Sequence, residues 1–144
     1  MSQETSEATY TGYARVAVAR SEAGWTVSGT SGSNAAIVQF ALNTGADQTV
    51  THFGIGTADS GAGKLLYSDA LTAPLVVREN VDEPKFAIGA LAVNKTGDIR
   101  FPEELLKLIL QNVDVTLIGD AGGLRGSVAA GSLYVSLHTA NPAA

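Results

Sequence analysis

The sequence predicts a mainly β protein, an antiparallel β-sandwich of jelly-roll type with one amphipathic α-helix. Short segments of alternating apolar and polar residues recur along the chain, and clusters of Gly, Ser, Asn and Asp separate them. The 144 residues are 45% hydrophobic and 16% charged, a composition that favours a folded core. We therefore expect a single β-sandwich domain over residues 1–144, with flexible ends at residues 1–9 and 140–144.

The strand predictions depend on alternation. In the segment Tyr13–Arg20, YARVAVAR, odd-numbered residues share one face of the strand and even-numbered residues the other. Pro74 lies between two predicted strands, and its missing N–H confines it to a sheet edge or a connection. The further predicted strands are Trp25–Ser28, Ala36–Leu42, Thr49–Gly56, Lys64–Ser68, Leu75–Arg78, Phe86–Val93 and Leu133–Thr139.

One helix is predicted from Pro102 to about Asn112. Proline loses no hydrogen bond at the first helical position, and Glu103 and Glu104 follow it at the positive end of the helix dipole. The helix has a wide apolar surface, which we expect to cap an open end or face of the sandwich. That surface consists of Leu105, Leu108, Ile109 and Leu110.

Composition excludes several classes of protein. The net charge is −5 and the nine basic residues are scattered, which disfavours binding to nucleic acid. The chain has no cysteine and therefore no disulfide or thiolate zinc site. The first ten residues lack the pattern of a secretion signal, and no apolar run is long enough to span a bilayer. We expect a soluble cytosolic product without a membrane partner.

A glycine-rich stretch, GIGTADSGAGK at residues 54–64, superficially resembles a phosphate-binding loop. The phosphate loop requires Gly, four residues and then Gly-Lys-Ser/Thr, but Ala58 occupies the position of the first glycine and Leu65 that of the hydroxyl residue. No amphipathic helix follows to direct its dipole at an anion. A mobile connection between two strands is therefore the favoured interpretation.

Residues that are candidates for catalysis do not form a recognisable pattern. His52 and His138 lie in predicted strands without metal-binding spacing, so structural roles are favoured over metal or acid-base roles. No GxSxG motif is present, and helix-end electrostatics and solvation explain the pairs Glu103–Glu104 and Asp82–Glu83. We predict no catalytic, cofactor-binding or metal-binding residues, no cofactor and no enzyme activity. A hydrolase would require a pocket with one of these histidines against a buried carboxylate.

Five aromatic side chains are candidates for a carbohydrate-stacking platform if they share an exposed face. Core or edge packing is the favoured alternative, because aromatic residues are more often buried. The five are Trp25, Tyr10, Tyr13, Tyr67 and Tyr134. The glycosylation pattern at Asn94–Thr96 has no weight without a secretion signal.

Several long segments resemble a family of small tailed-bacteriophage virion proteins known as tail fibre proteins, which serve as candidates for capsid decoration or cement. The resemblance is strong from Tyr10 to Leu91 and covers most of the chain. The segments are TYTGYARVAVARS, GWTVSG, SNAA, VTHFGIGTADSGAGKLLYS, ALTAPL, FAIGAL and LYVSLHTANP. The resemblance implies a structural protein of the virion that is made in the bacterial cytoplasm.

The order of these segments departs from the family pattern, in which the helix and the LYVSLHTANP-like strand come first. A loop similar to SQETSEAT and then YTGYARVAV follow them in the family. The chain thus resembles a circular permutant, with old termini joined near Asn94–Phe101 and new ones opened in a polar loop. An engineered origin is the favoured explanation, and natural rearrangement stays open.

The resemblance implies a function by protein–protein assembly. We expect a homo-oligomer that packs against phage capsid or tail proteins, because unpaired strand edges invite pairing and multiple copies supply avidity. The alternative is a carbohydrate-binding β-sandwich module for attachment to a cell surface. The sequence leaves open the capsid or tail location and the symmetry of the oligomer.

Overall fold

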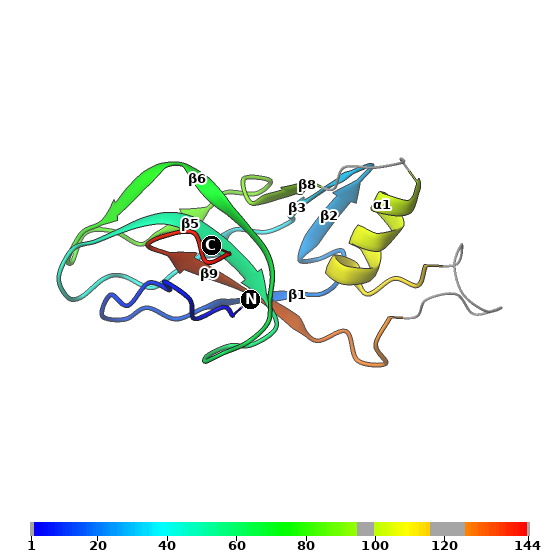
Figure 1. The fold of residues 1–144 in the computed structure, drawn as a ribbon. Helices are drawn as coiled ribbons and strands as arrows, with labels where there is room; N and C mark the ends of the chain where they lie inside the picture. The colour runs from blue at the N-terminus through cyan, green and yellow to red at the C-terminus, as the bar shows by residue number, and fades with distance from the viewer. Residues whose placement is uncertain (1, 95–99, 116–125, 144) are drawn as a thin grey trace. The chain divides into compact units, whose positions relative to one another are not determined.

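The computed structural model describes residues 2–94, 100–115 and 126–143 (Figure 1). The protein is mainly β, with antiparallel sheets and one short helix, which confirms the predicted fold class. The chain divides into two compact units. Unit 1 comprises Met1–Ala17, Val38–Lys85 and Leu133–Ala144, and unit 2 comprises Val18–Ile37 and Phe86–Ser132.

Most predicted elements are present, although several have different bounds. The predicted strand Phe86–Val93 is wrong, because the chain turns at Gly89, which has a positive φ of 77°, and only the two ends of this segment lie in strands. The first strands are β1 (Val16–Ala19), β2 (Trp25–Ser28), β3 (Ser31–Asn34), β4 (Val38–Gln39) and β5 (Gln48–Gly56). The later elements are β6 (Leu65–Val77), β7 (Lys85–Phe86), β8 (Ala92–Asn94), the helix α1 (Arg100–Leu106), the π-helical turn η1 (Lys107–Gln111) and β9 (Ser132–His138).

A four-stranded sheet in the order β1-β9-β5-β6 contains most of the strand residues of unit 1, and the boundary of the unit falls within β1. β9 runs antiparallel to β5 and places His138 directly opposite His52. Val50 and Ile55 of β5 and Val135 of β9 have no exposed surface, so the centre of this sheet supplies much of the core of unit 1. β4 and β7 form a separate two-stranded pair.

β6 joins two strands that the sequence predicted separately, Lys64–Ser68 and Leu75–Arg78. Its pairing with β5 shifts between Ala70, opposite His52, and Leu75, opposite Val50. The intervening residues include Pro74, and the extra residues bend the strand as a β-bulge does. β6 is an edge strand, as the position of Pro74 predicted.

Residues 2–8 pack along unit 1, where the sequence predicted a flexible arm. The Gln3 side chain is fully buried, and its amide donates a hydrogen bond to the Tyr134 carbonyl at 3.1 Å. Gly56 has no Cβ at the position where the Gln3 side chain lies, so a side chain there would displace Gln3. The glycine at the end of β5 therefore makes room for this N-terminal segment.

Unit 2 contains the sheet β2-β3-β8 and the helical segment α1–η1. Trp25 of β2 and Leu106 and Leu110 of the helical segment are fully buried. The Gln111 side chain donates a hydrogen bond to the Trp25 carbonyl at 2.8 Å, which ties the end of η1 to β2. Gly32 of β3 allows Leu110 to approach closely. The helix therefore covers the sheet of its own unit.

β3 was not predicted, because its sequence SGSN is typical of a turn. Asn34, the last residue of β3, is buried, and its side-chain amide donates to the carbonyls of Ala36 and Ala87 at 2.7 and 2.8 Å. Its side-chain oxygen accepts a hydrogen bond from the Leu91 N–H. Tertiary hydrogen bonds thus stabilise a strand that has weak intrinsic propensity.

Candidate functional site

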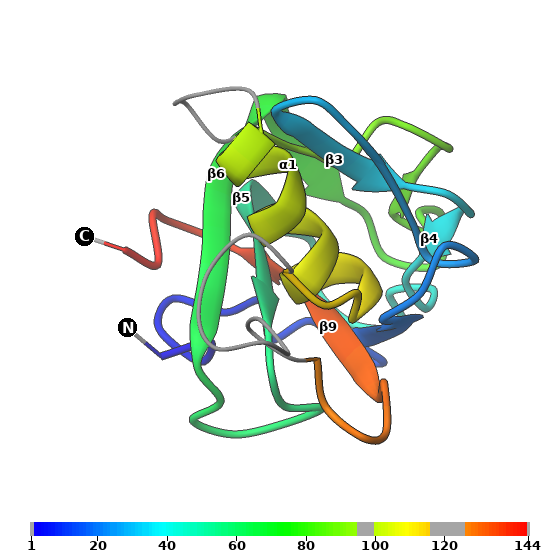
Figure 2. The ribbon, with the colours of Figure 1, turned by 90° about the vertical axis from the view of Figure 1, so that its right-hand side faces the viewer.

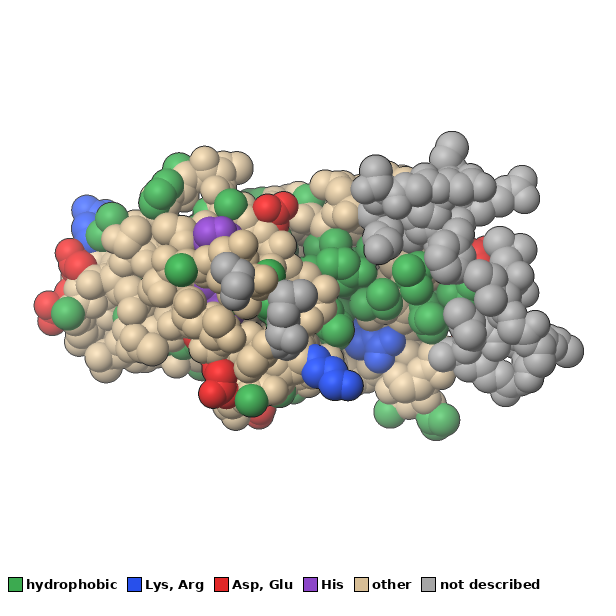
Figure 3. All heavy atoms as spheres, in the orientation of Figure 1, with side chains coloured by type: hydrophobic (Ala, Val, Ile, Leu, Met, Phe, Trp, Pro, Cys, Tyr) green, Lys and Arg blue, Asp and Glu red, His purple; other side chains and the backbone are tan. Residues whose placement is uncertain are grey.

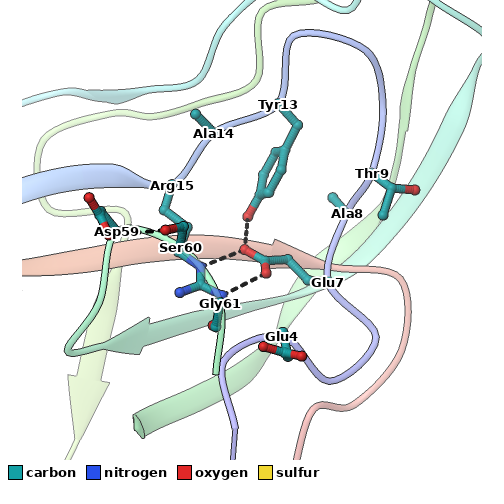
Figure 4. Close-up of a pocket in the computed structure, with 10 residues that line it drawn as sticks. All are labelled: Glu4, Glu7, Ala8, Thr9, Tyr13, Ala14, Arg15, Asp59, Ser60 and Gly61. Carbon is teal, nitrogen blue, oxygen red and sulfur yellow. Dashed lines mark hydrogen bonds and ion pairs between the residues drawn. The ribbon is translucent and has the colours of Figure 1, made fainter. Parts of the chain in front are cut away.

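A surface pocket of about 390 Å³ in unit 1 is the candidate site (Figure 4). Residues 4 and 7–9 of the N-terminal segment, residues 13–15 before β1, and residues 59–61 between β5 and β6 line this pocket. The lining includes three carboxylates and one guanidinium, those of Glu4, Glu7, Asp59 and Arg15. The volume would accommodate a small ligand.

Arg15 and Glu7 form a bidentate ion pair at the base of this pocket. Arg15 Nε lies 2.7 Å from Glu7 Oε1, and Arg15 Nη2 lies 2.7 Å from Glu7 Oε2. The Arg15 side chain is only 1% exposed and that of Glu7 15% exposed, so water screens the pair weakly. The pair links the N-terminal segment to the residues that lead into β1.

The loop between β5 and β6 completes the coordination of Arg15. Arg15 Nη1 donates to the Ala58 carbonyl at 3.0 Å, and Nη2 donates to the Gly61 carbonyl at 2.7 Å. A phosphate loop directs N–H donors at an anion, whereas this loop directs carbonyl oxygens at a cation. The glycine-rich stretch therefore holds a buried arginine of its own chain.

Tyr13 connects this ion pair to β9. Its hydroxyl donates to Glu7 Oε1 at 2.8 Å and accepts a hydrogen bond from the Leu137 N–H at 3.0 Å. Burial, together with the nearby Glu7 carboxylate, raises the pKa of the Tyr13 hydroxyl, so the side chain stays neutral. Its ring stacks against Phe40 at a centroid distance of 6.1 Å. Tyr13 thus lines the pocket and holds the Glu7 carboxylate in place.

The pocket is better suited to holding the fold together than to chemistry. All three guanidinium nitrogens of Arg15 already donate hydrogen bonds within the chain. Glu4 and Asp59 are exposed at its rim. Within the described ranges, no three His, Asp or Glu side chains are grouped so that they could hold a metal ion. The arrangement is therefore a polar junction between three segments of unit 1.

His138 is the fully buried member of the opposed histidine pair. Its Nδ1 lies 2.9 Å from the Thr5 carbonyl, and its Nε2 lies 2.9 Å from Ser136 Oγ. A carbonyl only accepts, so Nδ1 carries the proton and Nε2 accepts from the serine hydroxyl. His52 Nδ1 contacts Thr51 Oγ1 at 2.8 Å. Neither ring hydrogen-bonds to a carboxylate in the contacts described.

Acidification is expected to destabilise the protein through His138. Burial lowers the pKa of His138 below its ordinary value of 6.5, so the unfolded chain takes up this proton more readily. The contribution of His138 to the free energy of unfolding is complete above the pKa of this residue in the unfolded chain. It is lost as the pH falls through the lower pKa that the residue has in the folded protein. The urea concentration at the unfolding midpoint should therefore decrease when the pH is lowered from about 7.5 to about 5.5.

The control for this prediction is His138→Gln, which lacks the titrating group. The variant should be less stable than wild type at neutral pH and should show a smaller change in midpoint between the two pH values. Glu7 and Arg15 contribute charge near this ring in both proteins, as does His52. An unchanged pH dependence in His138→Gln would assign the acid sensitivity to other groups.

The aromatic candidates for carbohydrate stacking do not form an exposed platform. Trp25 is fully buried in unit 2. In unit 1, Tyr10 is 5% exposed and packs edge-on against Tyr13 at a centroid distance of 5.3 Å. Tyr67 and Tyr134 are half-buried. Trp25 and Tyr10 are thus core residues.

Three of the four paired carboxylates have local partners, whereas Glu104 Oε2 is buried without a hydrogen-bond partner. Glu103 forms an ion pair with Lys107 at 2.7 Å, one helical turn later. Asp82 forms an exposed ion pair with Arg78 at 2.9 Å, and Glu83 accepts a hydrogen bond from the Gln39 amide. Thr96 of the glycosylation pattern and most of the predicted permutation junction lie outside the described residues.

Sequence reasoning missed Glu7 as a partner of Arg15, because residues 1–9 were predicted to be flexible. A signal was available. Arg15 alternates with apolar residues in YARVAVAR, so a buried face would require a counter-ion. Glu4 and Glu7 are the acidic residues that precede it in the chain. Spacing alone does not choose between them.

Charged side chains are distributed as separate spots on the face shown in Figure 3, without a basic stripe among the described residues there. The described part of the chain also contains no helix that is long and apolar enough to cross a bilayer. The sheets and the buried ion pair define a β-rich protein whose candidate site is lined by an internal ion pair.

The comparison with known families agrees with a structural protein. The family described as podophage GP4 fiber I protein gp80 matches residues 2–94. The chain belongs to this phage fibre family, and the predicted resemblance to phage fibre proteins is confirmed. The match includes β1 to β8 and the segments that form the pocket. No curated protein and no solved structure matches the chain.

Proposed function

We propose that the chain is a structural component of a phage virion, of tail-fibre or capsid-decoration type, that acts by protein–protein assembly without enzymatic activity. Membership of the fibre family carries this proposal. The use of Arg15 as an internal junction supports it, because four of the five N–H groups of that guanidinium donate hydrogen bonds within the chain and its side chain is only 1% exposed. We expect other virion proteins and further copies of the chain as its partners, with the virion as its location.

The test is to locate the protein in purified phage particles. Gold-labelled antibody against the chain should mark either the fibres or the capsid of virions that encode it, which also separates the two locations. Labelling of disrupted particles with the same antibody is the control, because it detects a chain whose epitope is buried in the intact virion. Absence of the chain from intact and disrupted virions would contradict the proposal. If glycans bound the purified chain in that case, the carbohydrate-binding alternative would be favoured.

We also propose that the order of segments is a circular permutation of the family pattern, with an engineered origin. Residues at either side of the proposed opening are neighbours in unit 1: Thr139 N–H donates to the Ser6 carbonyl at 2.8 Å, and Glu7 pairs with His138. Figures 1 and 2 show both chain ends on the same side of this unit. Such proximity is what permutation requires.

A chain in the family order provides the test. It would begin at residue 101, run to residue 144, continue through a short linker into residue 2 and end at residue 94. Because the packed contacts are retained, its urea midpoint and circular dichroism spectrum should match those of the present chain. A reordered chain that fails to fold, with several linker lengths, would contradict permutation.

A further inference from the structure

We propose that unit 1 contains a binding site for a short polar peptide with a glutamine and a glutamate four residues apart, and that residues 2–8 of the chain occupy this site. The inference goes beyond the proposed virion function and does not depend on it. Gln3 is buried and Glu7 nearly so, whereas residues 4–6 between them are exposed. Two side chains, rather than the whole segment, therefore define the class of ligand.

The first anchor of the segment is the Gln3 side chain, which is fully buried. Its amide nitrogen donates to the Tyr134 carbonyl at 3.1 Å, and its amide oxygen accepts from the Ala58 N–H at 3.0 Å. A Cβ at Gly56 or Gly63 would collide with this side chain. The site thus requires both a donor and an acceptor, and an ionised glutamate would place a second acceptor against the Tyr134 carbonyl.

The second anchor is the Glu7 carboxylate, which binds the Arg15 guanidinium and the Tyr13 hydroxyl (Figure 4). Ala58 connects the two anchors, because its N–H donates to Gln3 and its carbonyl accepts from Arg15. A ligand must therefore present its amide and its carboxylate at the separation that this loop residue sets.

Main-chain hydrogen bonds attach the segment to the end of β9. The Ala8 N–H donates to the Leu137 carbonyl at 2.8 Å. The Ser6 carbonyl accepts from the Thr139 N–H, also at 2.8 Å. Such bonds can form with any residue type, so they supply affinity, while the two anchors supply specificity.

The groups that bind the segment belong to other parts of unit 1. They lie in β5, in β9, in the loop between β5 and β6 and in the residues that precede β1. The segment SQETSEA contains only one apolar side chain, that of Ala8. Because a segment with few buried apolar contacts opens locally at low cost in free energy, a free peptide with the same two anchors can compete for the site.

Rescue by a free peptide tests the site in the whole chain. Gln3→Ala removes the first anchor from the attached segment, so its urea midpoint should lie below that of wild type. The peptide SQETSEAT, residues 2–9, should raise this midpoint as its concentration increases, because it binds the folded state. The same peptide with the change Gln3→Ala should require a concentration about tenfold higher or more for an equal increase.

Hydrogen exchange at Ala58 reports the first anchor directly. Its N–H should exchange faster in Gln3→Ala than in wild type, and the peptide should restore its protection by replacing the lost acceptor. Gln3→Ala combined with Gly56→Ala is the matched control. The added methyl group occupies the position of the glutamine side chain, so the peptide should change neither the midpoint nor the exchange at Ala58.

Gln3→Glu provides a second chain for the same measurements if Gln3→Ala does not fold, because it keeps the volume of the side chain. The same rescue by SQETSEAT is expected there. Equal effects of the two peptides would overturn the proposal. So would the lack of any effect at millimolar concentration, which is the scale of the effective concentration of the attached segment.

Discussion

Arg15→Ala is expected to lower the free energy of unfolding by about 3–5 kcal/mol, the cost of removing one partner of a buried ion pair. The substitution leaves the Glu7 carboxylate with little exposure and only the Tyr13 hydroxyl as a described partner. It also leaves the carbonyls of Ala58 and Gly61 without their donor. Urea unfolding followed by circular dichroism would measure the effect.

The matched control is Arg78→Ala, which breaks an ion pair whose arginine side chain is 59% exposed. We expect that variant to keep the wild-type urea midpoint, because solvent screens exposed pairs. Arg15→Met combined with Glu7→Leu should recover part of the stability lost in Arg15→Ala, since neither charge is then buried alone. Equal midpoints for Arg15→Ala and wild type would show that this junction does not stabilise unit 1.

Trp25→Ala is expected to destabilise the protein by about 3–5 kcal/mol, because it removes the largest buried side chain of unit 2 and leaves a cavity. The same substitution should leave any glycan binding of the folded protein unchanged, since the indole has no exposed surface. Circular dichroism would follow unfolding. Thr26→Ala, at the next and exposed position of β2, is the control and should have a small effect. A loss of glycan binding without destabilisation would contradict this account.

Trp25 also offers a test of domain organisation. We propose that the two compact units unfold together as one domain, because the chain passes between them several times. The single tryptophan lies in unit 2, so its fluorescence reports that unit, whereas circular dichroism reports both. Coincident unfolding curves would support one cooperative domain, and separate transitions would contradict it.

Local pattern predicted those parts of the fold that depend on local physics. Alternation located β2 at its observed bounds and β5 and β9 to within one residue at each end, and Pro102 with the following glutamates located the helix. β3 could not be found in this way, because SGSN forms a strand only through pairing with β2 and β8. Pro74 suggested two separate strands, but a bulge allows β6 to continue through this residue as one strand.

The candidate site was less accessible to prediction than the fold. The exclusion of a phosphate loop followed from spacing, but the role of that stretch as a carbonyl lining for Arg15 depends on contacts between positions far apart in sequence. The burial of Gln3 and the ion pair of Glu7 depend on the same tertiary packing. A polar segment such as SQETSEAT gives no local sign that Gln3 will be buried against the rest of unit 1.

The central position of β9 has a consequence for synthesis. β5 and β6 can form a hairpin as soon as both have left the ribosome, yet the strand that must occupy the other side of β5 is translated much later. Until then the backbone N–H and C=O groups on one side of β5 have no strand partner in the nascent chain, and other chains can pair with them. This sheet is thus completed late, and its completion is slow because β5 and β9 are far apart in the sequence. Conditions that delay elongation should therefore favour aggregation of nascent chains.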